Sequence, residues 1–173
     1  NKIYMKILTI KDLIINNLTK DKRIIIRVDF NVPIDNGVIM NDQRIVQSLP
    51  TIKYLIEHSD FKSIVILSHL GRPKGVYNKN LSLKPIHELL QKLLKIDIIF
   101  MEDGCRYNNF FKIWNCKKGK IFLLDNIRFY MEDTLKIDSN EHHIYNKSLI
   151  SLFRQRLNAF GDIFINDAFG SCH

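Results

Sequence analysis

The segment Arg23-Ile-Ile-Ile-Arg-Val-Asp-Phe-Asn-Val-Pro33 joins a short apolar run to a polar loop. Further runs of strand length, rich in β-branched or aromatic residues, cover residues 63–68, 96–100, 120–124 and 162–166. Most of these runs are apolar at nearly every position, which is typical of strands covered on both faces, as in a parallel sheet. The sequence therefore predicts five buried strands, the first of them over residues 23–29.

Segments with helical periodicity lie between the predicted strands. Apolar residues recur at helical spacing over 45–56, 85–95 and 149–160. Pro50 is expected either to kink the first of these helices or to begin a second segment. Residues 103–118 are interpreted as one helix broken near Asn108, with Trp114 in the core, and residues 132–146 as a surface excursion. Alternating strands and helices predict an α/β fold, a three-layer Rossmann-like domain with a mostly parallel sheet and helices on both faces.

Composition limits the class of protein without choosing a function. A chain of 173 residues with 46% apolar and 25% charged residues is long enough for one core, and no internal domain boundary is evident. Three cysteines do not form a disulfide or zinc pattern, and no apolar run has the length of a membrane span. The net charge of +8 favours either nucleic-acid binding or a site for small anions.

Polar side chains follow four of the five predicted strands. Asp29 and Asn31 follow the first, and His69 and Arg72 follow the second. Arg128 lies shortly after the fourth, and the polar stretch 166–173 follows the fifth. Ligands of open α/β sheets bind at the carboxyl ends of the strands, where such residues converge. A guanidinium donates paired hydrogen bonds to carboxylate or phosphate, and carboxylate and amide groups suit substrate hydroxyls. These residue types predict a site for a small polyhydroxy acid phosphate.

Each of these residues also has a purely structural interpretation. Arg27 is expected to pair with a carboxylate, Asp29 and Asn31 can stabilise a turn, and Arg72 can be an ordinary loop arginine. The histidine pair at 142–143 lacks a third ligand at metal spacing, so no metal site is predicted. The sequence contains neither a P-loop nor a Gly-x-Gly-x-x-Gly pattern. Its one dense basic run, residues 117–120, has no interleaved aromatic residues, which argues against nucleic acid.

Six sequence motifs, in order and at compatible spacing, resemble the N-terminal domain of the phosphoglycerate kinases. They are Arg27-Val-Asp-Phe-Asn-Val-Pro33, Gln43-Arg-Ile45, Ser68-His-Leu-Gly-Arg-Pro73, Ser82-Leu-Lys-Pro85, Leu123-Leu-Asp-Asn-Ile-Arg-Phe129 and Phe164-Ile-Asn-Asp-Ala-Phe-Gly-Ser-Cys-His173. The resemblance covers nearly the whole chain. It implies that residues 1–173 form the substrate-binding domain and that the C-terminal nucleotide domain is absent.

The resemblance implies reversible phosphoryl transfer between 1,3-bisphosphoglycerate and Mg-ADP, giving 3-phosphoglycerate and Mg-ATP. Asp29 and Asn31 would hold the hydroxyl and carboxyl end of the substrate. Arg44 would stabilise the transferring phosphoryl group. Further substrate-binding residues implied by the matching motifs are His69, Arg72, Arg128 and His173. Mg-ATP or Mg-ADP would be bound by the C-terminal domain, so this chain is expected to hold no cofactor or metal and to be inactive alone.

Two departures from the family pattern stand out. Asp125 replaces the usual Glu before Asn126, and Ser171-Cys172 replaces Thr-Ala before His173. The principal alternative is a non-catalytic basic α/β module that binds nucleic acid or a protein, and a further alternative is an unfolded remnant. A glycolytic role implies a monomeric cytoplasmic protein with no nucleic-acid or membrane partner, although a plastid form remains an alternative.

Overall fold

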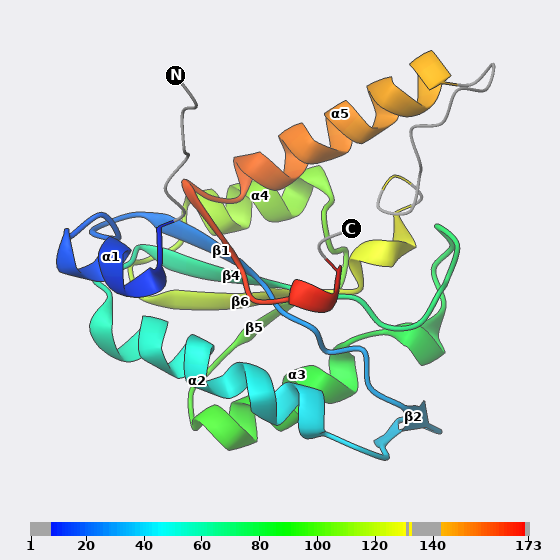
Figure 1. Ribbon diagram of the computed structural model, residues 1–173. Coiled ribbons are helices and arrows are strands. Elements are labelled where there is room, and N and C mark those ends of the chain that lie inside the picture. Colours follow the sequence, from blue (N-terminus) through cyan, green and yellow to red (C-terminus); the bar gives the residue numbers. More distant parts are fainter. Residues whose placement is uncertain (1–7, 131, 133–142, 172–173) are drawn as a thin grey trace.

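A five-stranded parallel sheet forms the centre of the molecule (Figure 1). The computed structural model describes residues 8–130, 132 and 143–171. The strands lie in the order β5-β6-β4-β1-β7, and every neighbouring pair is parallel. Their bounds are Arg23–Arg27 for β1, Ser63–Leu67 for β4, Ile99–Met101 for β5, Lys120–Leu124 for β6 and Ile163–Asn166 for β7. The predicted parallel α/β architecture is confirmed.

Helices cover both faces of this sheet, as Figure 1 shows. The helices α2 (Gln43–His58) and α3 (Lys84–Leu94) lie on one face, and α4 (Tyr107–Trp114) and α5 (His143–Ala159) lie on the other. A short helix, α1 (Ile10–Ile15), precedes β1. Because strand side chains alternate between faces, Ile24 and Ile26 of β1 pack toward α2 and α3, whereas Ile25 packs toward α5.

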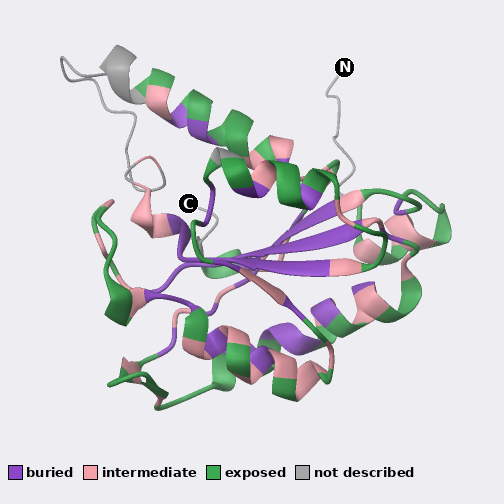
Figure 2. Cartoon of the chain, turned by 180° about the vertical axis from the view of Figure 1, so that it is seen from behind, coloured by how far each residue is buried: buried purple, intermediate pink, exposed green. Residues whose placement is uncertain are grey.

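The buried core therefore has two halves, one on each face of the sheet. Figure 2 shows the sheet between helices whose outer faces are exposed. The central strands β1, β4 and β6 are buried along most of their length, whereas the edge strands β5 and β7 are only partly buried. β4 is buried at all five of its positions, because it lies in the middle of the sheet with a strand on either side. This burial explains the nearly continuous apolar runs in the sequence. Among the described residues, no helix is long and apolar enough to cross a membrane.

The segment between β1 and α2 contains a small hairpin that was not predicted from the sequence. The strands β2 (Ile34–Asp35) and β3 (Val38–Ile39) pair in an antiparallel arrangement. Asn36 and Gly37 form the turn with φ values of +47° and +80°. Asn-Gly is a favoured two-residue hairpin turn because both residues tolerate positive φ. The Asn-Gly pair is thus the sequence signal that indicates this hairpin.

The third predicted strand begins three residues later than expected, at Ile99. The backbone of Ile98 is held by side chains of α3 instead of by a neighbouring strand. Its N–H donates to Gln91 Oε1 at 3.0 Å, and its carbonyl lies 2.6 Å from His87 Nε2. The apolar pattern of residues 96–98 therefore reflects packing against a helix.

The structure narrows one prediction about helices and corrects another. α2 is one continuous helix that contains Pro50, which excludes the alternative in which a second segment begins there. The segment 103–118 contains a single helix that begins only at Tyr107. Trp114, expected in the core, is 45% exposed, and the guanidinium of Arg23 lies 3.5 Å above its ring centre. The predicted excursion over residues 132–146 falls largely outside the described residues.

Candidate anion-binding site

A pocket of about 620 Å³ lies at the carboxyl ends of β1, β4 and β7. It brings together loops after these strands, the first turns of α2, and Arg128 in the short 3₁₀ helix η2 (Ile127–Phe129) that follows β6. The lining residues are Asp29, Asn31, Arg44, Gln47, Ser48, His69, Gly71, Arg72, Arg128, Asp167 and Gly170. All predicted site residues within the described part of the chain therefore face one pocket, and His173 lies outside the described residues.

The loop after β1 is shaped by its own polar side chains. Asp29 Oδ1 accepts a hydrogen bond from the backbone N–H of Asn31 at 3.0 Å. Ser68 Oγ accepts from the N–H of Phe30 at 2.9 Å and donates to the carbonyl of Val28 at 2.8 Å. The loop after β1 is thus tied to the end of β4. Asp29 therefore stabilises the turn after β1, and it also lines the pocket.

Asp29 also forms an ion pair with Arg44 at the start of α2. Arg44 Nη1 lies 2.5 Å from Asp29 Oδ2, and the Arg44 side chain is 52% exposed. The pair leaves the rest of the guanidinium at the pocket mouth. A ligand anion would compete with Asp29 for Arg44, because charge-assisted hydrogen bonds to either partner have similar strength.

Gly71 is held between two other predicted site residues. Its N–H donates to Asn31 Oδ1 at 2.9 Å, and its carbonyl accepts from Arg128 Nη1 at 3.0 Å. Gly71 has φ of +60°, and a Cβ there would lie 2.9 Å from Leu81 Cδ2. The positive φ favours glycine at this position, and a Cβ would also force the end of the Leu81 side chain to move.

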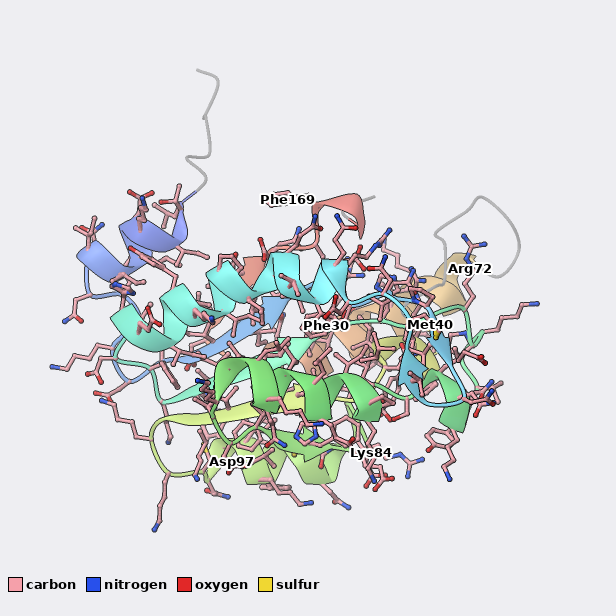
Figure 3. All side chains as sticks on the ribbon, turned by 90° about the horizontal axis from the view of Figure 1, so that it is seen from below. Phe30, Met40, Arg72, Lys84, Asp97 and Phe169 are labelled. Atoms are coloured by element: carbon pink, nitrogen blue, oxygen red, sulfur yellow. The ribbon has the colours of Figure 1, made fainter. Side chains whose placement is uncertain are left out.

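Arg72 continues this loop with an exposed side chain. In Figure 3, Arg72 lies toward the same end of the molecule as Met40 beside β3, whereas Asp97, which precedes β5, lies toward the other end. This placement agrees with the convergence of the loops at the carboxyl ends of the strands. The side chain of Arg72 is exposed, whereas Arg128 is partly buried and donates to the carbonyl of Gly71.

His69 is buried, with only 4% of its surface exposed. The pKa of His69 is lowered to about 4, mainly by burial and also by the nearby positive charges of Arg128, Arg27 and Arg44, while Asp29 acts in the opposite direction. Its Nδ1 makes no hydrogen bond to any described residue. At neutral pH His69 is therefore an uncharged hydrogen-bonding group, and the positive charge of the pocket comes from its arginines.

The low pKa of His69 predicts that acid destabilises the fold. The unfolded histidine, with a pKa near 6.5, binds its proton at higher pH than the folded one, with a pKa of about 4. This contribution is complete above pH 6.5 and is lost as the pH falls toward 4. At about 1.4 kcal/mol per pKa unit it is on the order of 3 kcal/mol. Urea unfolding of the wild type and of His69→Gln should show a pH-dependent difference across this window, and parallel curves would contradict the assignment.

Several lining residues were not predicted from the sequence. Gln47 and Ser48 lie one turn along α2 from Arg44, and Asp167 and Gly170 follow β7. The positions of Gln47 and Ser48, three and four residues after Arg44 on a predicted helix, could have indicated that they face the same pocket. Arg27 Nε is buried without a hydrogen bond to any described residue, and the expected carboxylate partner is not found in the described part of the chain. The positive charge of Arg27 instead acts on His69.

The pocket suits an anion better than a metal ion. Arg44, Arg72 and Arg128 face it, and no group of three metal-ligating side chains occurs among the described residues. A larger pocket of about 720 Å³, bordered by α4 and α5, is mostly apolar. Its two arginines, Arg106 and Arg156, each lie 3.9 Å from a carboxylate. The smaller pocket is therefore the candidate site, because three arginines converge there with hydrogen-bonding groups at the carboxyl ends of the strands.

Comparison with known proteins relates this arrangement to one family. The family model described as phosphoglycerate kinase matches residues 11–173. Phosphoglycerate kinases of Kluyveromyces lactis and Emericella nidulans are 42% and 45% identical, over 96% and 89% of this chain. The chain spans only 39% and 38% of their lengths.

Solved structures give the same relationship. The phosphoglycerate kinase of Coxiella burnetii matches with a TM-score of 0.67 and 34% identity, covering 90% of this chain and 34% of that one. The enzyme of Pyrococcus horikoshii matches with a TM-score of 0.73 and 30% identity, covering 90% of this chain and 36% of that one.

Proposed function

This chain belongs to the phosphoglycerate kinase family, and from that membership we propose that it supplies the lobe that binds 3-phosphoglycerate and 1,3-bisphosphoglycerate. The proposed reaction is reversible transfer of the acyl phosphate of 1,3-bisphosphoglycerate to ADP, giving 3-phosphoglycerate and ATP. The observation that carries the proposal is the convergence of three arginines and a neutral histidine on one pocket. Such a pocket offers positive charge for phosphate and neutral donors for hydroxyl and carboxyl groups.

The proposed roles follow from the position of each side chain. Arg128, partly buried at η2, would hold an anionic group of the substrate inside the pocket. Asn31 uses its carbonyl oxygen for Gly71, so its amide nitrogen is the atom offered to the substrate. Arg72 would add a second positive charge from the exposed side of the loop.

Arg44 would act on the transferring phosphoryl group. Its guanidinium is half exposed at the mouth of the pocket, where a phosphoryl donor or acceptor outside this chain can approach. Phosphoryl transfer depends mainly on in-line positioning and on positive charge near the equatorial oxygens. Separation from Asp29 would free Arg44 for this contact, and Asp29 would then accept a hydrogen bond from a substrate hydroxyl.

We propose that the magnesium nucleotide is held outside this chain. The described residues offer no cluster of acidic or histidine ligands, and the arginine-rich pocket would repel a divalent cation. Since the chain spans 39% of the length of its Kluyveromyces lactis relative, the remainder of such a protein is the proposed nucleotide-binding partner lobe. We further propose a monomeric cytosolic enzyme, in keeping with a role in glycolysis.

Titration with 3-phosphoglycerate tests the proposal. Calorimetry is expected to show binding to the wild type that weakens with salt, and Arg44→Ala and Arg72→Ala should each reduce affinity about three- to tenfold. The loss is moderate because both side chains are solvent-exposed. Arg106→Ala is the matched control, since this arginine is 73% exposed and lies outside the site pocket.

Two outcomes would contradict the assignment. Unchanged affinity in both site variants would mean that the pocket is not the binding site. Binding of single-stranded or duplex DNA in competition with 3-phosphoglycerate would instead favour a basic binding module.

A further inference from the structure

Asn126 lies directly after β6 and is completely buried, with 0% of its surface exposed. It does not line the site pocket. Its side chain nevertheless makes four hydrogen bonds. Oδ1 accepts from the N–H groups of Leu70 at 3.2 Å and Arg128 at 3.1 Å, and Nδ2 donates to the carbonyls of Leu70 at 2.7 Å and Leu81 at 2.9 Å. These bonds use the full capacity of a carboxamide, two donors and two acceptor sites.

The partners of Asn126 are the supports of the pocket. Leu70 stands between His69 and Gly71, so the two bonds to its backbone fix the segment that carries both of them. The bond to the N–H of Arg128 fixes the backbone of Arg128, whose guanidinium donates to the Gly71 carbonyl. A single side chain thus orients three pocket residues that come from two separate loops.

The bond to Leu81 adds a third segment to this arrangement. Leu81 ends the 3₁₀ helix η1 (Lys79–Leu81), and its side chain lies against Gly71. Asn126 therefore holds Leu70 and the carbonyl of Leu81 at the point where Gly71 and Leu81 approach most closely. Because the Leu81 side chain packs tightly against Gly71, a change in the spacing of these two segments would move the loop relative to the pocket.

Asp125 holds Asn126 in turn. It is also 0% exposed, and its Oδ1 accepts from the N–H of Leu83 at 2.7 Å and from the N–H of Asn126 at 2.8 Å. The hydroxyl of Ser82 donates to its Oδ2 at 3.0 Å. The shorter acid at this position is thus fully bonded, and it joins the end of β6 to the start of α3.

We propose that Asn126 is a positioning residue of the anion site, which sets the location of His69, Gly71 and Arg128 through backbone hydrogen bonds without touching the ligand. The inference rests on the proposed function for its ligand, 3-phosphoglycerate. Its structural part, the orientation of the loop around Leu70, can be measured without any ligand.

Asn126→Ser tests this role, with Asn109→Ser as the matched control. Asn109 is also a buried asparagine, 2% exposed, whose Nδ2 donates to the carbonyl of Gly104 at 2.8 Å, away from the site pocket. Both variants are expected to lower the melting temperature, because both break buried hydrogen bonds. Only Asn126→Ser should weaken 3-phosphoglycerate binding, by about tenfold, because only it releases the pocket loop.

NMR measures the pKa of His69 and the chemical shift of the Gly71 amide, which a general loss of stability in a folded variant would not change. In Asn126→Ser, the pKa of His69 should rise from about 4 toward 6.5, and the Gly71 amide signal should shift, because the loop no longer holds His69 in its buried position. In Asn109→Ser both should match the wild type. Asn126→Gln, which keeps all four bonding groups on a longer side chain, should give a smaller change and serves as the variant to use if the serine variant does not fold.

The outcomes separate the two proposals. A wild-type chain that does not bind 3-phosphoglycerate contradicts the proposed function and leaves the NMR comparison to decide the positioning role. Wild-type values for the His69 pKa and the Gly71 amide in a folded Asn126 variant overturn that role. An equal loss of binding in Asn109→Ser overturns it as well, since general destabilisation would then explain the effect.

Discussion

Arg128→Ala is expected to weaken 3-phosphoglycerate binding by about a hundredfold. Arg128 is the least exposed of the three arginines that line the pocket, and its guanidinium also supports the loop through the carbonyl of Gly71. Loss of hydrogen bonds to a charged group costs about 1.5–3 kcal/mol, and each 1.4 kcal/mol is a factor of ten in affinity. Calorimetric titration of the wild type and the variant under one salt condition measures this change.

Arg128→Lys distinguishes charge from geometry at the same position. Lysine keeps the positive charge, but it lacks the planar group that can bond Gly71 and an oxyanion together. We expect an intermediate affinity for the lysine variant. We also expect the pKa of His69 to rise in Arg128→Ala, because the positive charge of Arg128 contributes to lowering it. Wild-type affinity in Arg128→Ala would remove Arg128 from the proposed site.

Ile66→Ala is expected to destabilise the fold by about 4 kcal/mol, within the usual range of about 2–5 kcal/mol for such core truncations. Ile66 is 0% exposed in β4, and its register neighbours on the two adjacent strands are Ile26 and Leu123. All three belong to the core cluster on the α2 and α3 face. The cavity left by the substitution cannot close without moving the sheet or a helix. Urea unfolding followed by circular dichroism measures the loss.

Phe164→Ala is the matched control in the same sheet. Phe164 is larger than isoleucine but 59% exposed on β7, at one edge of the sheet. Its truncation should cost much less than that of Ile66, because less buried surface is lost. Equal destabilisation by the two substitutions would contradict the assignment of β4 to the centre of the core.

Some strands were predicted correctly from the sequence and others were not, and the difference has a physical cause. Runs such as 63–68 and 120–124 were recognised because a strand covered on both faces needs apolar residues at nearly every position. The run at 96–98 has the same composition, yet its backbone bonds to Gln91 and His87 of α3. Apolar content reports burial, and it does not report which partner receives the backbone hydrogen bonds.

The candidate site was also predicted only in part from the sequence. The residue types that follow the strands predicted an anion site, because parallel strands bring their carboxyl ends to one edge. They did not predict that Arg44 pairs with Asp29 or that Asn31 uses its carbonyl for Gly71. They also did not predict that His69 is too buried to carry charge at neutral pH. These properties depend on distances between side chains from different loops.

The amino-acid sequence alone established the α/β class, the alternation along the chain of the five sheet strands with helices, and the edge of the sheet where polar residues gather. Local periodicity and chain connectivity govern these features. The tertiary structure alone decided the order of the strands within the sheet, the neutral state of His69 and the hydrogen bonds of the Asn126 side chain. Burial lowers the pKa of His69, and the four hydrogen bonds of the Asn126 side chain reach three residues in three segments. Both effects arise only when segments distant in the sequence exclude water together.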